Sequence, residues 1–152
     1  MIRFLPAALF ALAAIAQSAS AQSAEPTSAQ YLKAVPLTIR TAHGPKTYSI
    51  EVARTPDQQE IGLMFRTSMP AKSGMIFPMD PPRMATFWMK NTLISLDLIF
   101  IRPDGTISSI APNAPVRSLD IIASFEPVAA VLELNAGAAK RDGLKPGDRV
   151  RW

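Results

Sequence analysis

Apolar and polar residues alternate along several short segments of this chain, with the period of two that is typical of β-strands with one buried face. Residues 35–41 and 47–53 follow this pattern, and the turn at residues 43–46 between them predicts an antiparallel hairpin. A second turn at residues 102–105 predicts that residues 106–111 return beside the strand before them. We therefore expect a sheet built largely from hairpins.

The most apolar part of the chain after its first residues runs from Phe87 to Ile101. It is too short for a membrane span and rich in β-branched and aromatic residues, so we interpret it as two buried strands joined at residues 91–95. Residues 128–134, interrupted only by Glu133, and the short run 75–77 predict further buried strands.

Two segments carry helix signals instead. Thr55 is a hydroxyl cap followed by proline and an acidic residue, which predicts a helix that runs to about Phe65. Asn135 is expected to cap a second helix over residues 136–142, and residues 149–152 should close the chain as a strand with Trp152 facing inward. Short strands with two short helices and no regular strand–helix alternation predict an α+β domain, mainly antiparallel and barrel-like.

The first residues of the chain have the pattern of a signal peptide. Residues 1–21 contain one cation, an apolar run and a small-x-small ending, so we expect cleavage after Ala21 and a periplasmic or secreted protein with no permanent membrane anchor. An amino-terminal anchor is the alternative, but the apolar run falls below the roughly 20 residues that a span needs. Residues 22–34 are polar and are expected to form a flexible tether before a single domain at residues 35–152.

Composition excludes several classes of site. The chain has no cysteine, so disulfides and a lipid-attachment cysteine are absent, and His43, the single histidine, lies in a predicted turn without partners for a metal. Removing Arg3 with the signal lowers the net charge from +4 to +3, and the basic residues are scattered rather than clustered, which argues against nucleic acid as a partner. Methionines between residues 64 and 89 could bind a soft metal, but their spacing favours packing, and we predict neither metal nor cofactor.

Polar side chains inside apolar segments are the best candidates for a functional site, because burying them is unfavourable unless they are paired or face a cavity. Lys90, Asn91 and Asp97 are expected to gather at one sheet end, where Trp88 would add a flat apolar surface. Such a site suits a small polar ligand, for example a carbohydrate. The full candidate set is Glu60, Arg66, Trp88, Lys90, Asn91, Asp97 and Glu133.

Two alternatives remain open for the same residues. Asp97 and Glu133 could act as the acid and base of a hydrolase, although the chain has no phosphate-binding loop and no nucleophile elbow, and no catalytic residue is assigned. Alternatively, Lys90 could pair with Asp97 or Glu133 in an internal salt bridge, so that the domain serves a structural or protein-interaction role without a ligand.

Several motifs resemble one family in the order in which they occur. They are Glu60-x-Gly62-Leu63-Met64-x-Arg66, Gly74-Met75-Ile76-Phe77, Phe87-Trp88-Met89-Lys90-Asn91-Thr92, Leu96-Asp97-x-Ile99-Phe100-Ile101 and Val131-Leu132-Glu133-Leu134-Asn135-Ala136-Gly137 followed by Gly147-Asp148. From about Ile50 to Val150 the chain resembles the domain-of-unknown-function 192 family of uncharacterised ancient conserved region proteins, although Ser95 stands where that family usually has proline. The resemblance implies a compact β-rich domain, often exported in bacteria, and no assigned activity.

Overall fold

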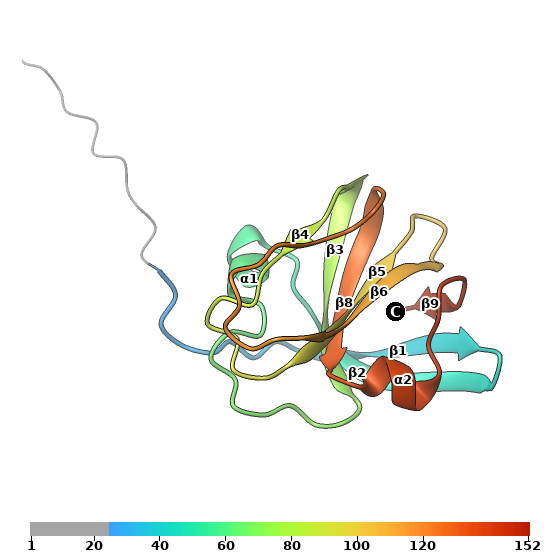
Figure 1. Cartoon of the computed structure of the whole chain (residues 1–152), viewed down its shortest axis with the longest axis horizontal. Coiled ribbons are helices and arrows are strands. Elements are labelled where there is room, and N and C mark those ends of the chain that lie inside the picture. Colours follow the sequence, from blue (N-terminus) through green and yellow to red (C-terminus); the bar gives the residue numbers. More distant parts are fainter. Residues whose placement is uncertain (1–24) are drawn as a thin grey trace, which may run out of the picture.

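A computed structural model describes residues 25–152, so the signal peptide predicted at residues 1–21 lies outside the described residues (Figure 1). The described chain is mainly β, with a seven-stranded sheet, a two-stranded sheet and two short helices. The elements of the large sheet are β1 (Ala34–Thr41), β2 (Gly44–Val52), β3 (Ser73–Arg83), β5 (Leu96–Ile101), β6 (Ile107–Ala114), β8 (Val128–Asn135) and β9 (Arg149–Arg151). The small sheet pairs β4 (Thr86–Phe87) with β7 (Ile122–Ala123), and the helices are α1 (Pro56–Ile61) and α2 (Ala138–Asp142).

The large sheet is mixed, with the strand order β6-β5-β8-β3-β2-β1-β9. The predicted hairpins β1–β2 and β5–β6 are confirmed, and all pairs in this sheet are antiparallel except β2–β3. The parallel pair arises because α1 and the irregular chain after it carry the backbone across to start β3 in the same direction as β2.

The sheet is curved but is not a closed barrel, which corrects the barrel-like prediction. Its edge strands, β6 and β9, approach each other only through an isolated bridge between Thr106 and Arg149 and a few neighbouring backbone hydrogen bonds. Strand β9 has only three residues, so the contact that it offers to β6 is short.

Both faces of the central strands are buried, so β5 is apolar on every side except at Asp97. One face contributes Ile76, Ile99 and Leu132 to a core that also contains residues of α2. The opposite face contributes Phe77 and Leu98 to a second core, which the chain after α1 and the β4–β7 sheet cover. The second core is the one that borders the candidate site.

Several predicted boundaries were wrong. Helix α1 ends at Ile61 rather than Phe65, which has a positive φ of 62°. Strand β3 extends from Ser73 to Arg83, well beyond the predicted run 75–77, and it accommodates the prolines at 78, 81 and 82 because the ladder to β8 is interrupted between Pro78 and Arg83. The first of the two strands predicted within Phe87–Ile101 is reduced to the two residues of β4, and Trp152 is 44 % exposed instead of facing inward.

The segment before β1 lies against the domain. The Gln30 side chain donates hydrogen bonds of 2.7 and 3.0 Å to the carbonyl oxygens of Gln58 and Gly62, and the Leu32 amide donates to a carboxylate oxygen of Glu51. A flexible tether was predicted for residues 22–34. Gln30 and Leu32, in its second half, are instead held against the domain by these partly buried hydrogen bonds.

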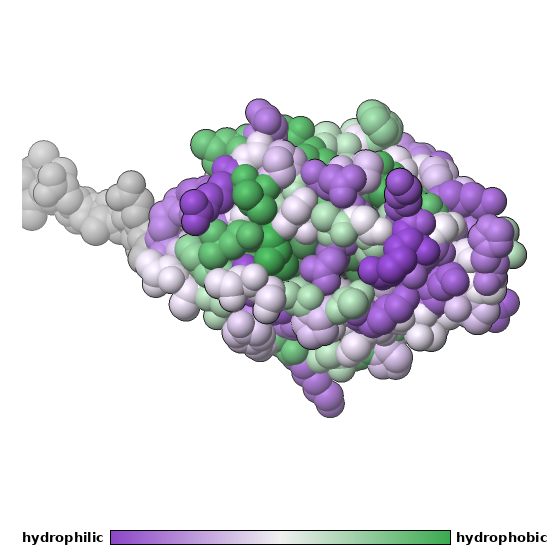
Figure 2. Space-filling model, turned by 60° about the horizontal axis from the view of Figure 1, so that its bottom comes forward, coloured by the Kyte–Doolittle hydropathy of each residue, from purple (hydrophilic) through white to green (hydrophobic). Residues whose placement is uncertain are grey.

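The surface combines hydrophilic areas with an apolar patch. On the face shown in Figure 2, apolar residues gather toward the end of the molecule where the described chain begins, while hydrophilic residues cover most of the opposite end. The large apolar side chains exposed on the molecule as a whole include Leu119, Ile121 and Phe125 in the connection between β6 and β8. Among residues 25–152, no helix has the length and hydrophobicity that a membrane crossing requires.

Candidate functional site

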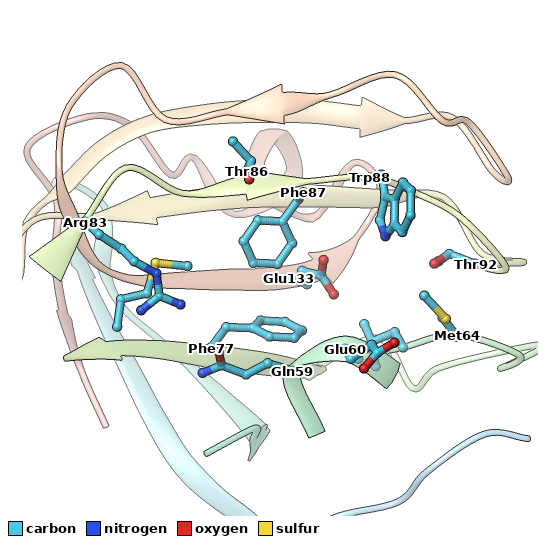
Figure 3. A pocket seen from close by; sticks show the side chains of 13 residues that line it. Gln59, Glu60, Met64, Phe77, Arg83, Thr86, Phe87, Trp88, Thr92 and Glu133 are labelled. Carbon is cyan, nitrogen blue, oxygen red and sulfur yellow. The ribbon is translucent and has the colours of Figure 1, made fainter. Parts of the chain in front are cut away.

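A cavity of about 180 Å³ lies beside the second core, between the large sheet, the α1 region and the β4 segment (Figure 3). The sheet provides its floor, the end of α1 and the turn after it provide one wall, and residues of the β4 segment provide the other. The residues that line it are Gln59, Glu60, Gly62, Leu63, Met64, Phe77, Met79, Arg83, Thr86, Phe87, Trp88, Thr92 and Glu133.

Glu133 is the polar residue of the cavity floor. In the register of β8 it stands opposite Met75 of β3 and Leu98 of β5, so its side chain emerges on the face of the second core. It is only 5 % exposed, and its carboxyl group makes none of the hydrogen bonds or ion pairs found among residues 25–152. Burial raises the pKa of Glu133 to about 8, so the carboxyl group is largely protonated at neutral pH.

Aromatic rings surround this carboxyl group. The rings of Phe77 and Phe87 meet edge to face with their centroids 5.1 Å apart, and Trp88 is 47 % exposed at the cavity rim. Figure 3 shows the Glu133 carboxyl group directed into the space bordered by Trp88 and Glu60. The arrangement offers a ligand flat apolar surfaces and two carboxyl groups.

Arg66 does not line the cavity, and its contacts are structural. Its guanidinium group forms two hydrogen bonds of 2.7 and 2.8 Å with the Glu51 carboxylate, donates to the Gln30 carbonyl oxygen, and lies 4.5 Å from the ring centre of Tyr31. Since the side chain is 4 % exposed, this pair joins β2 to the chain after α1 and to the amino-terminal segment.

Lys90 and Asn91 lie outside the cavity lining as well. The Lys90 ammonium group pairs with Glu25 at 2.7 Å and lies 5.2 Å from the ring centre of Trp88. Asn91 has a positive φ of 56°, and its carbonyl oxygen accepts a hydrogen bond from the Phe65 amide. The proposed internal salt bridge of Lys90 with Asp97 or Glu133 is therefore wrong.

Asp97 is fully buried and binds backbone instead of facing a cavity. Its carboxylate accepts hydrogen bonds of 2.9, 3.1 and 2.9 Å from the amides of Asn113, Gly137 and Ala139. Asp97 stands opposite Leu134, the residue after Glu133, so the two acidic side chains emerge on opposite faces of the sheet. They cannot form the acid and base pair of a hydrolase.

We predict that Lys90→Met changes the free energy of unfolding by no more than about 0.5 kcal/mol, because an ion pair with a largely exposed partner contributes little. Urea denaturation of the variant measures this value. A loss of several kcal/mol would show that the ammonium group compensates a buried carboxylate after all.

Three of the seven predicted site residues, Glu60, Trp88 and Glu133, are brought together at the cavity. Sequence reasoning missed most of the others that line it, because Phe77 and Phe87 have the pattern of ordinary core residues. Thr92 and Arg83 carried no local signal, since their place depends on how the β4 segment folds over β3. In the part of the chain that the structure describes, no group of three or more histidine, cysteine or acidic side chains is arranged to hold a metal ion.

The fold and the cavity define a β-rich domain with a lateral pocket that contains a buried carboxyl group. The chain belongs to the DUF192 family, described as an uncharacterized ACR, whose model matches residues 37–152. This confirms the resemblance seen in the sequence motifs.

Solved structures support the same relationship. A protein of unknown function from Novosphingobium aromaticivorans is 46 % identical with a TM-score of 0.78, and the match covers 80 % of this chain and 86 % of that one. A protein from Sinorhizobium meliloti, described as a candidate transcription regulator, is 44 % identical with a TM-score of 0.76, and the match covers 83 % and 96 %. A comparison with curated proteins gives no match.

Proposed function

We propose that this protein binds a small polar molecule in the cavity between α1, β4 and β8. The observation that carries the proposal is Glu133, a carboxyl group that is 5 % exposed, lacks a protein partner among the described residues and faces the cavity. A carboxyl group that emerges into an apolar core without a hydrogen-bonding partner is unfavourable, and this one is open only toward the cavity. Packing therefore does not explain an acid at this position, whereas a ligand that bonds to it would.

The lining limits what can bind. The cavity volume of about 180 Å³ is below that of typical drug-binding pockets, so the ligand is a small metabolite or one end of a larger molecule. Trp88 and Phe87 provide apolar contact, while Gln59, Glu60 and Thr92 supply polar groups at the walls. A monosaccharide, which has apolar ring faces and hydroxyl edges, is one class that this combination accommodates.

A thermal-shift screen of the purified protein tests the proposal. Sugars, amino acids, cell-wall fragments and small amines should include at least one compound that raises the melting temperature, because a ligand of the folded state stabilises it by mass action. The shift should be lost in Trp88→Ala and retained in Trp152→Ala, a matched replacement of the other tryptophan, which is not in the lining. If no compound in the panel shifts the melting temperature, the proposal fails and the protein-interaction alternative is favoured.

We do not propose nucleic acid binding for this protein, although the Sinorhizobium meliloti protein is described as a candidate transcription regulator. Several basic side chains are already engaged with acidic ones, which leaves fewer for phosphate groups. These pairs are Arg66 with Glu51, Lys72 and Arg141 with Asp142, Lys90 with Glu25, and Arg102 with Glu126.

We also propose that the protein acts in the periplasm or outside the cell. The support is the sequence of residues 1–21, which has the charge, apolar run and small-residue ending of a cleaved signal. Amino-terminal sequencing of the protein from an exporting cell should begin at residue 22. A chain that still begins at Met1 would contradict the proposal.

A further inference from the structure

We propose that the ligand of this pocket is a small organic cation, whose ammonium group lies between the carboxyl groups of Glu60 and Glu133 and against the ring of Trp88. The inference rests on the proposed function, because it takes the cavity as the binding site, and it adds the chemical class of the ligand.

The charges of the lining favour a cation at one end of the cavity. Its ionisable residues are Glu60, Arg83 and Glu133. Figure 3 shows Arg83 at the far end, with Phe87 between it and the Glu133 carboxyl group, whereas Glu60 lies at the end toward which that carboxyl group points. Lys90 approaches the ring of Trp88 near this end, but Glu25 pairs with its ammonium group at 2.7 Å.

The aromatic residues favour the same charge. The face of an indole ring attracts cations more strongly than that of any other side chain, and the attraction grows as the contact is desolvated. Trp88 is half-exposed at the rim, where the Lys90 ammonium group already lies 5.2 Å from its ring centre, and Phe77 and Phe87 also line the cavity. Rings next to carboxyl groups form the environment in which quaternary ammonium compounds are recognised.

The ionisation of Glu133 distinguishes the binding of a cation from the binding of a neutral sugar. In the empty pocket its carboxyl group is mainly protonated at neutral pH, since burial raises its pKa to about 8. An ammonium ion stabilises the carboxylate, so binding should release about one proton, and the affinity should rise roughly tenfold per pH unit between about pH 6 and 7. A neutral sugar whose hydroxyl group accepts a hydrogen bond from protonated Glu133 would release no proton on binding. It would bind less well above the pKa of Glu133.

Titration calorimetry of the purified protein with choline, ethanolamine and 3,3-dimethylbutan-1-ol, the neutral isostere of choline, provides the test. We expect one of the two cations to bind about tenfold or more tightly than the isostere, which corresponds to roughly 1.4 kcal/mol. Repeating the titration in buffers with different ionisation enthalpies counts the proton released.

Two substitutions test whether Glu133 is responsible for the affinity for the cation and for the proton release. Glu133→Gln should weaken binding of the cation at least about tenfold and abolish the proton release, because a buried amide cannot neutralise an ammonium charge. Glu126→Gln removes a carboxylate that pairs with Arg102 and is not in the lining, and it should leave both values unchanged. Equal affinity for choline and its isostere, or binding of sugars but of neither cation, would overturn the cationic class and leave the pocket as a binding site. Absence of binding by the two cations and by every compound of the thermal-shift panel would overturn the proposed function as well.

Discussion

Replacing Glu133 by glutamine should stabilise the protein at about pH 8.5 by several kcal/mol, up to about 5 kcal/mol, and change its stability little near pH 4. Few substitutions of a buried charge-bearing residue are expected to stabilise a fold. The expectation follows from the position of the side chain, which is 5 % exposed on the face of the second core without a partner among the described residues.

The direction in which stability changes with pH follows from proton linkage. The pKa of Glu133 rises from 4.5 in the unfolded chain to about 8 in the folded protein, so between these values the folded state holds a proton that the unfolded state has lost. The stability of the wild-type protein should therefore fall as the pH rises through this window, by at most about 1.4 kcal/mol per pH unit, and level off above about pH 8. Glutamine has no charge to bury, so the variant lacks this loss.

Urea denaturation across the pH range measures the effect. The difference in free energy of unfolding between Glu133→Gln and the wild type should grow as the pH rises from 4.5 to about 8 and then level off. Glu126→Gln is the matched control, because hydrogen bonds from Ser108 and Arg102 lower the pKa of Glu126 in the folded protein, while in the unfolded chain it keeps the ordinary value of 4.5. Glu126 is therefore ionised in both states over most of this window. A constant difference between Glu133→Gln and the wild type would show that this carboxyl group is charged and compensated in the folded protein.

Asp97→Ala should destabilise the protein by about 3–5 kcal/mol, because it opens a small cavity and leaves three backbone N–H groups without an acceptor, of which that of Ala139 is buried and those of Asn113 and Gly137 are partly buried. Two of these amides belong to Gly137, the residue before α2, and to Ala139 in its first turn. The third belongs to Asn113 of β6. A single carboxylate on β5 thus joins an edge strand to the start of α2.

The loss should be large relative to the total stability of a domain of this size, which is about 5–15 kcal/mol. Asp97→Asn keeps one acceptor oxygen and should lose roughly half as much stability. It should also keep its affinity for the pocket ligand, since position 97 faces away from Glu133.

Urea denaturation of both variants at neutral pH measures these losses. Asp120→Ala, which removes an exposed carboxylate bound only within its own loop, serves as the control and should change stability by less than about 0.5 kcal/mol. Loss of ligand binding in a folded Asp97→Asn protein would show that Asp97 contributes to the binding site.

The sequence by itself determined most of the strands of this protein. Periodic apolar positions identified β1, β2, β5 and β8, and turn residues identified the two hairpins, because these signals depend on near neighbours in the chain. The same reasoning selected Asp97 and Glu133 as polar residues inside buried strands, and both are buried.

Only the tertiary structure decided what those two acids do. Strand register places Glu133 opposite Leu98 and Asp97 opposite Leu134, and a shift by one residue would exchange their faces. The acceptor for the first amides of α2 is Asp97 on β5, about 40 residues earlier in the chain. The sequence suggested Asn135 as the cap of this helix. The Asn135 side chain instead donates hydrogen bonds to the carbonyl oxygens of Met69 and Pro70. Local pattern shows that a polar residue is buried, but the identity of its partner depends on contacts between distant segments, which only the folded chain creates.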